Sequence, residues 1–196
     1  MWNLEKINLY LKDNLKLTRY NHSIGVRDCA INLARFYGED EKKAEIAGLV
    51  HDCAKNLSDT EILSLLQDNN IEVDKIYLKS PFIFHGLAGS IIARDKFGIE
   101  DKEILSAIEY HTTGKDNMSG LEKIIYLADY IEPNRKFKEV ENLRELAYKD
   151  LNFALLESLN NTIKFVIEKN SILHEDTIKA RNYLIFKEDV YGKNNN

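Results

Sequence analysis

The chain has 196 residues, a net charge of −5 at pH 7, 44% hydrophobic and 30% charged residues, which is the composition of a soluble globular protein with one core. The acidic balance argues against non-specific nucleic-acid binding, because phosphate backbones are held by basic surface. No apolar run approaches about 18 residues and no signal pattern opens the chain, so we expect no membrane partner. The two cysteines form no C-x-x-C pair, and we expect free thiols in the cytoplasm.

The hydrophobic pattern predicts helices along the chain and no strand. Only two prolines and nine glycines occur, and long runs without either favour helices. The fold class is therefore predicted as all-α in a single domain. In chain order, the first helices are expected over 2–16, from a Thr18 cap to 37, after an Asp40 cap and from a Ser58 capping box to 67. The next are expected from Pro81 to 97 and after an Asp101 cap. The last are expected over 121–131, 139–148 and 150–169, and from Asp176 onward.

Two polar residues stand side by side at the end of an apolar helical run, His51 and Asp52. Adjacent helix positions point about 100° apart, so the pair can share one object only where the helix ends. Imidazole and carboxylate groups are ligands of first-row divalent metal ions, and a metal ion is such an object. The plain alternative is a pair of side chains exposed at the helix end.

The apolar stripes of four predicted helices each hold a histidine: His22, His51, His85 and His111. The stripe that holds His22 is expected to continue through Val26, Cys29 and Leu33 to Phe36. Asp52 adjoins one of them, and Asp129 lies on a fifth helix. One buried histidine is most simply a hydrogen-bonded core residue, but four would each need a partner of their own. A shared metal centre satisfies them together, and a donor set without thiolate suits iron, manganese or zinc. Six ligands exceed one tetrahedral shell, which favours two metal ions.

The order of these residues resembles the HD-domain metal-dependent phosphohydrolases and, among them, the bacterial YqeK-like family. The likeness covers nearly the whole chain. It rests on Arg19-x-x-His22-x-x-Gly25-Val26, on Ala47-Gly48-Leu49-Val50-His51-Asp52-x-x-Lys55, on Ala107-Ile108-x-x-His111-Thr112-Thr113-Gly114, on the run from Glu122 through Asp129-Tyr130-Ile131-Glu132-Pro133 to Arg135, and on His174-x-x-Thr177-x-x-Ala180-x-Asn182.

This resemblance implies an HD-domain helical bundle and a symmetrical bis(5'-nucleosyl)-tetraphosphatase, an enzyme that hydrolyses diadenosine tetraphosphate to two ADP. It implies two divalent metal ions, iron favoured over manganese and zinc. It implies one domain over 1–192, with a metal-binding core at about 18–135, helices at 139–191 that complete the nucleotide pocket, and a frayed tail at 193–196. The implied metal ligands are His22, His51, Asp52, His85, His111 and Asp129, with Asp52 bridging the two ions.

Lys55 lies four residues after His51, on the same helix face, and is expected to act with Asp52 in catalysis by stabilising phosphoryl charge. The alternative is a solvated lysine at a helix C-terminus. His174 is not expected to bind metal. The resemblance implies nucleotide contacts from Lys55, Thr112, Thr113, Arg135, Thr177, Ala180 and Asn182, which as bare sequence would be turn, cap or surface residues.

Two other functions stay open. One is an HD phosphohydrolase that acts on a nucleoside mono- or triphosphate, because the same ligand set would serve it. The other is a helical interaction protein with a structural metal site, although structural sites are usually closed and four-coordinate. The sequence sets neither the base preference nor the metal, and it leaves open whether the chain forms a homodimer.

Overall fold

The computed structural model describes residues 1–188, and in this range the chain forms helices and no β-strand. The predicted all-α fold is confirmed, while the predicted tail at 193–196 lies outside the described residues. Across residues 1–188, no helix combines the length and the apolar character needed to cross a membrane. The helices are α1 (Leu4–Asn14), α2 (Leu17–Tyr37), α3 (Glu41–Val50), α4 (Asp59–Asp68), the 3-10 helices η1 (Tyr77–Lys79) and η2 (Pro81–Phe84), α5 (His85–Asp95), α6 (Lys102–Tyr110), α7 (Gly120–Ile131), α8 (Val140–Ala147), α9 (Leu151–Glu168) and α10 (Glu175–Glu188).

Side-chain caps fix several of the helix starts where the sequence predicted them. The Ser58 hydroxyl accepts from the backbone N–H of Glu61, and the Glu61 carboxylate accepts from the backbone N–H of Ser58, which is a capping box. Asp40 and Asp101 accept from N–H groups in the first turns of α3 and α6. Gly38 ends α2 with φ +74°, a left-handed conformation that glycine adopts readily.

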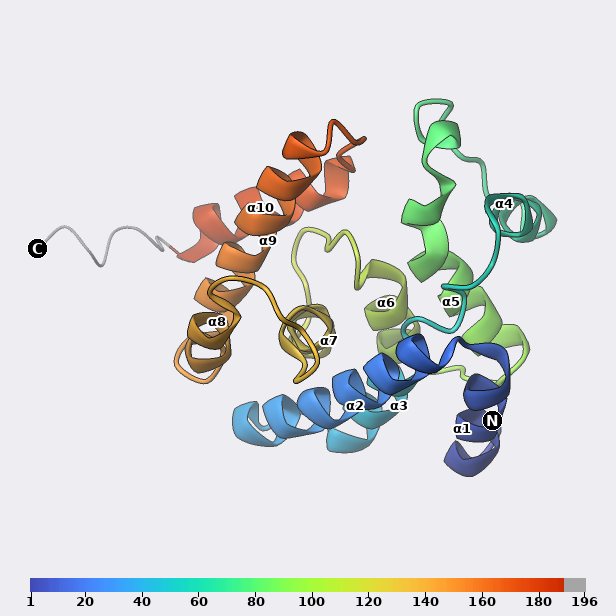
Figure 1. The fold of residues 1–196 in the computed structure, drawn as a ribbon, viewed down its shortest axis with the longest axis horizontal. Coiled ribbons are helices and arrows are strands. Elements are labelled where there is room, and N and C mark those ends of the chain that lie inside the picture. The colour runs from blue at the N-terminus through green and yellow to red at the C-terminus, as the bar shows by residue number, and fades with distance from the viewer. Residues whose placement is uncertain (189–196) are drawn as a thin grey trace, which may run out of the picture.

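The core lies where α2, α3, α6 and α7 pack on one another (Figure 1). Its largest side chains, among them Leu33, Phe97 and Ile124, are fully buried. On one side α5 packs against α6, and α4 packs against α5. On the other side α9 packs against α7 and carries α8 and α10. Figure 1 shows α6 and α7 between these two groups of helices, so both groups can contribute to a site above them.

Two details of the predicted helices are wrong. α2 begins at Leu17, and Thr18 lies inside the first turn instead of capping it. Phe36, predicted on the buried stripe of that helix, is 56% exposed and contacts the rings of Tyr37 and Tyr148. The helical period continues to the end of α2, but the helical period alone does not determine whether a residue is buried.

Gly86 allows α5 and α6 to approach closely. A Cβ atom on Gly86 would lie 2.4 Å from the main-chain oxygen of Glu109. His85 directly precedes this glycine, and His111 directly follows α6. The close approach of the two helices therefore brings the imidazoles of His85 and His111 together, with ring centroids 4.9 Å apart.

We expect Gly86→Ala to destabilise the fold by about 1–3 kcal/mol, because the added methyl group meets backbone that cannot rotate away. Urea unfolding followed by circular dichroism measures the change. Gly89→Ala is the matched control, since it lies one turn further on the same helix and its Cβ would lie 3.3 Å from the main-chain oxygen of His51, a milder contact than at Gly86. Equal losses for the two variants would contradict the close approach at Gly86.

Candidate metal centre

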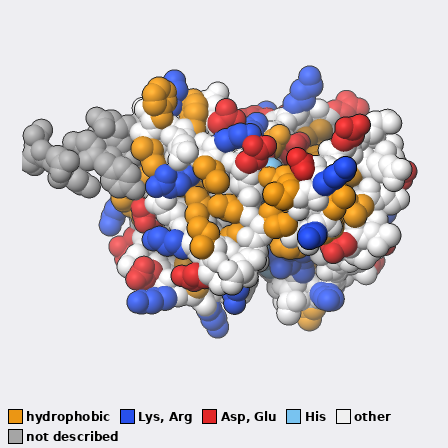
Figure 2. All heavy atoms as spheres, turned by 90° about the horizontal axis from the view of Figure 1, so that it is seen from above, with side chains coloured by type: hydrophobic (Ala, Val, Ile, Leu, Met, Phe, Trp, Pro, Cys, Tyr) orange, Lys and Arg blue, Asp and Glu red, His pale blue; other side chains and the backbone are white. Residues whose placement is uncertain are grey.

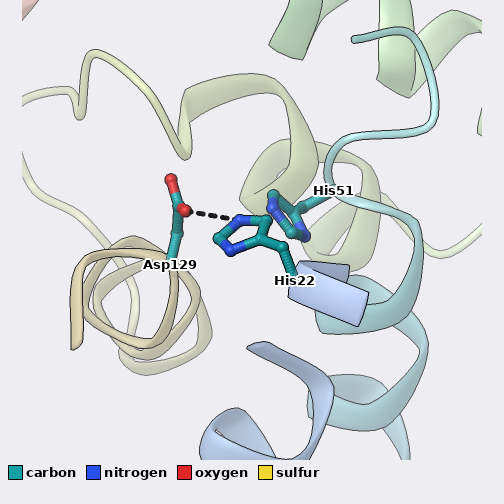
Figure 3. A group of neighbouring side chains, drawn as sticks. All are labelled: His22, His51 and Asp129. Carbon is teal, nitrogen blue, oxygen red and sulfur yellow. Dashed lines mark ion pairs between the residues drawn. The ribbon is translucent and has the colours of Figure 1, made fainter. Parts of the chain in front are cut away.

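The six residues predicted as metal ligands lie together in the core of the fold. His22 comes from α2, His51 and Asp52 directly follow α3, and His85 begins α5. The four histidines and Asp52 are buried, with 0% exposure for His51 and 1% for Asp52, whereas the Asp129 side chain is 21% exposed. Figure 3 shows His22, His51 and Asp129 pointing toward one another, and Nε2 of His22 lies 2.9 Å from Oδ1 of Asp129.

The Asp52 carboxylate lies between two pairs of imidazoles. Its Oδ2 atom is 3.4 Å from Nε2 of His51 and 3.8 Å from Nε2 of His22. Its Oδ1 atom is 3.3 Å from Nε2 of His85 and 3.5 Å from Nε2 of His111. Each oxygen therefore faces a different pair of ring nitrogens.

Three of the four rings are oriented by main-chain carbonyls through their Nδ1 atoms. Because a carbonyl oxygen only accepts, each Nδ1 carries a proton, and Nε2 of the neutral ring presents a lone pair. Nε2 of one such ring, His51, and Oδ1 of Asp52 have no hydrogen-bond partner among the described residues. These converging lone pairs fit a divalent cation. The hydrogen bonds from ring Nδ1 to main-chain oxygen join His51 to Gly48 (2.8 Å), His85 to Phe82 (2.6 Å) and His111 to Ile108 (2.7 Å).

Two overlapping groups of donor atoms lie close enough together to hold a metal ion: His22, His51 and Asp129, and His51, Asp52 and His111. Burial acts to raise the pKa of Asp52, but the neighbouring imidazoles hold that pKa well below its usual range. Burial also lowers the pKa of His85, to about 4, against the attraction of Asp52. At neutral pH both groups are thus in the protonation state that binds metal.

Two arginines contact the carboxylates of this centre. Nη1 of Arg19 lies 2.6 Å from Oδ2 of Asp52. Arg135, predicted to bind nucleotide, donates from Nε to the main-chain oxygen of Asp129 at 2.8 Å and from Nη2 to its carboxylate. Arg19 was not predicted as a site residue. The available signal was its spacing, since it lies about one helical turn before His22.

Lys55 approaches the same centre from the segment that follows α3. Its Nζ lies 3.0 Å from Nε2 of His85 and 3.9 Å from Oδ1 of Asp52, while a third of the side chain stays exposed. Burial is the main cause that lowers the pKa of Lys55. This lysine is therefore not the freely solvated residue of the alternative interpretation.

A largely apolar cavity opens beside the metal centre. Thr112 belongs to both, because its Oγ1 lies 3.0 Å from Nε2 of His85 and 3.1 Å from Nε2 of His111. Figure 2 looks onto the molecule from above and shows hydrophobic side chains gathered across this face, with a histidine visible between them. Among the lining residues are Phe82, Ile83, Thr112, Thr113, Phe165 and Thr177.

The other residues predicted to contact nucleotide divide into two groups. Thr113 and Thr177 line the cavity with Thr112. Ala180 is buried and packs close to Gly114 outside the lining. Asn182 lies on the exposed side of α10, where its Oδ1 accepts from Nη1 of Arg181 at 3.1 Å.

Sequence reasoning missed an aromatic contact at the edge of this cavity. His174, which lines the cavity, stacks on Tyr77 with ring centroids 4.6 Å apart, and the edge of Phe84 faces the same imidazole. The Tyr77 hydroxyl accepts from the backbone N–H of Glu175 at 3.3 Å. This contact joins η1 to the segment before α10, and no local sequence pattern links residues so far apart.

Comparison with known protein families matches residues 19–134 to the HD domain. The chain belongs to the HD domain family. The matched segment contains all six residues of the metal centre, so the family predicted from the sequence is confirmed.

Relatives of this HD domain chain share most of its length. A protein of Halalkalibacterium halodurans named symmetrical bis(5'-nucleosyl)-tetraphosphatase is 44% identical over 91% of this chain and 95% of its own. A Bacillus subtilis protein of the same name is 40% identical over 93% and 98%. A crystal structure from Clostridium acetobutylicum, described as a predicted HD superfamily hydrolase involved in NAD metabolism, matches with a TM-score of 0.94 and 54% identity, over 96% of this chain and 100% of that one.

We expect Asp52→Ala to abolish stoichiometric metal binding while the helical circular dichroism signal is kept, because both oxygens of this carboxylate face the ring nitrogens. Elemental analysis after anaerobic loading and desalting measures the bound metal. Asp28→Ala is the control, since Asp28 lies exposed on α2 and pairs only with Arg27. Retention of metal by Asp52→Ala would exclude a central role for this carboxylate.

Proposed function

We propose that the protein is a metal-dependent hydrolase that cuts diadenosine tetraphosphate at the central anhydride into two ADP. The observation that carries this proposal is the 44% identity, over nearly the whole chain, to a protein named symmetrical bis(5'-nucleosyl)-tetraphosphatase. The buried histidine and aspartate cluster supports it, because hydrolysis of a phosphoanhydride in this family depends on metal.

Two divalent ions are proposed for the centre, iron favoured, with manganese and zinc as alternatives. Asp52 is proposed to bridge them, since one of its oxygens faces the His22 and His51 pair and the other faces the His85 and His111 pair. Asp129, next to His22, adds a ligand to the first pair. Elemental analysis of the loaded protein tests the number.

When bound, such ions polarise phosphoryl oxygens and lower the pKa of water toward neutrality. The residues of the chain bind and orient the polyphosphate. Lys55 is proposed to stabilise charge on the phosphate of the departing ADP, because its ammonium group lies at the rim of the centre. Arg19 and Arg135 each use part of a five-donor fork on a carboxylate, and their other N–H groups are proposed to bind phosphate oxygens.

The cavity beside Thr112 is proposed to hold one nucleoside of the substrate. Phe82 and Phe165 offer flat apolar surface to a purine, and Thr177 adds a hydroxyl group. Because Thr112 contacts both the cavity and the metal centre, a nucleoside in the cavity is proposed to place its phosphates at a fixed distance from the ions. This distance is proposed to select cleavage that leaves an ADP unit on the nucleoside bound in the cavity.

In this proposal the chain forms one domain, predicted over 1–192, in which a core at about 18–135 binds metal and the helices predicted at 139–191 complete the nucleotide pocket. Residues 189–192 of this prediction lie outside the described part of the chain. A cytoplasmic location is proposed because Cys29 and Cys53 are free thiols, as expected in a reducing compartment. The proposed partner is the nucleotide substrate. Whether the chain also forms a homodimer is tested by measuring its molecular mass in solution.

A second candidate reaction is hydrolysis of another nucleotide. The 54% identical structure is described as a hydrolase involved in NAD metabolism, which favours including NAD and its mononucleotides in a substrate screen. The same metal centre would serve that reaction, and only the contacts to the base and sugar would differ.

Lys55→Ala is expected to lower turnover by about 10²-fold or more with metal content unchanged, the usual loss when one electrostatic donor is removed. The rate at saturating substrate and the metal content are measured on the same preparation. Lys12→Ala is the control, since Lys12 is exposed on α1. Unchanged turnover of Lys55→Ala would return this lysine to a solvated, non-catalytic role.

Diadenosine tetraphosphate is expected to give two ADP, with one of the two labelled when the reaction runs in ¹⁸O-water. If the nucleoside bound in the cavity sets the cleavage site, the triphosphate-bridged dinucleotide gives ADP and AMP, more slowly if the far nucleoside also contributes binding. Mass spectrometry of the products measures both. ATP and AMP as main products from the tetraphosphate would contradict the symmetrical cut, and rapid turnover of NAD or a mononucleotide instead would favour the second candidate.

A further inference from the structure

A buried carboxylate that the proposed reaction does not use lies behind His22. Glu132, the residue after α7, is 1% exposed. Its Oε1 lies 3.0 Å from Nδ1 of His22, whereas Nε2 of the same ring faces Asp129 at 2.9 Å. Its Oε2 accepts from the backbone N–H of Asn134 at 2.7 Å and from the side-chain amide at 3.0 Å.

The backbone around Glu132 is held by a second side chain as well. Arg144 of α8 donates from Nη2 to the main-chain oxygen of Glu132 at 2.7 Å and to that of Arg135 at 3.1 Å, and from Nε to that of Ile131 at 2.8 Å. This one guanidinium group spans the turn that follows α7. Changes in the Glu132 side chain should therefore leave the path of the turn in place.

The space next to the Glu132 carboxylate exists because residue 25 is glycine. A Cβ atom on Gly25 would lie 2.4 Å from Oε2 and 3.2 Å from Cδ of Glu132. Gly25 lies three residues after His22, on the same face of α2. Any side chain at this position would push the carboxylate away from the imidazole.

His22 differs from the other three histidines in its place on a helix. His51 and His111 follow the last residues of α3 and α6, and His85 lies where η2 gives way to α5, so these rings reach a carbonyl three residues earlier. His22 lies within the 21-residue helix α2, where the carbonyls are engaged in helical hydrogen bonds. It therefore needs an acceptor from another part of the chain.

We propose that Glu132 is a positioning residue that keeps the proton of His22 on Nδ1 and so keeps Nε2 available to a metal ion, and that Gly25 makes room for it. A carboxylate without a proton only accepts hydrogen bonds, so the bond from Nδ1 to Glu132 favours this protonation of the ring. Nε2 lies near Asp129 but makes no hydrogen bond with the described residues. Partners of this kind fix the ring orientation and raise the basicity of the ligand. The proposal rests on the metal centre proposed above.

Glu132→Gln keeps the size of the side chain but removes its charge. Its single amide oxygen would have to accept from both His22 and Asn134. We expect its affinity for Mn²⁺, measured by competition with a chelator, to fall about 10- to 100-fold, the usual loss for such partners. Glu122→Gln is the matched control. Glu122 is a buried glutamate of α7 that contacts Ser106 and Lys115 and no histidine, so its loss should change stability and leave Mn²⁺ affinity unchanged.

A double-mutant cycle tests the role of Gly25. Gly25→Ala alone should weaken Mn²⁺ binding about as much as Glu132→Gln. In a Glu132→Ala background the same change should cost at most about twofold, because the carboxylate that it would displace is gone. Equal losses in the two backgrounds would overturn the proposed link between these residues.

NMR spectra of the metal-free protein, labelled with ¹⁵N at its histidines, show which ring nitrogen of His22 carries the proton. The His22 signals are assigned by comparison with a variant that lacks this histidine. We expect a proton on Nδ1 of His22 in the unmodified chain and averaging between the two nitrogens in Glu132→Gln. An unprotonated Nδ1 in the unmodified chain, or unchanged Mn²⁺ affinity in Glu132→Gln, would overturn the proposal. If Glu132→Gln does not fold, the spectrum of the unmodified chain and the Gly25→Ala affinity decide. These readouts need no substrate, so they are separate from the failure of the proposed hydrolysis.

Discussion

The carboxylate of Asp52 lies inside the protein, and an ionised group in that position is stable only if nearby groups replace the water it has lost. Arg19 and Lys55 bring positive charge to it, and the four imidazoles around it present ring nitrogens that can share a divalent cation with it. These imidazoles come from α2, α5 and the ends of α3 and α6. The carboxylate of Asp52 is therefore surrounded by its partners only when those helices pack closely together. The close approach at Gly86 is one part of it, because a wider gap between α5 and α6 would separate His85 from His111.

The rings around Asp52 also show how helix ends and helix interiors offer different chemistry. At an end, a side chain can turn back to a carbonyl three residues earlier, and three histidines are oriented in this way. Inside a helix the carbonyls are already bonded, and His22 depends on Glu132 from a segment more than a hundred residues away in the sequence. The cost of placing a metal ligand in mid-helix is thus a second buried acid and the glycine that accommodates it.

Much of this could be read from the sequence because helical periodicity is a local property. The stripes that carry His22, His51, His85 and His111 follow the 3.6-residue repeat, and all four side chains are buried as predicted. The same rule failed for Phe36, since periodicity does not report whether a neighbouring helix covers the stripe. The stacked contact between Tyr77 and His174 could not be predicted for a similar reason, because it joins segments that only tertiary packing brings together.

The donor atoms of the centre are spread along the chain from His22 to Asp129, and only the folded packing of the helices brings them within a few ångströms of one another. An unfolded chain therefore offers no comparable site, and a metal ion that binds the folded form shifts the folding equilibrium toward it by mass action. The supply of metal in the cell would then set how often the chain opens to proteases, and so its lifetime as well as its activity.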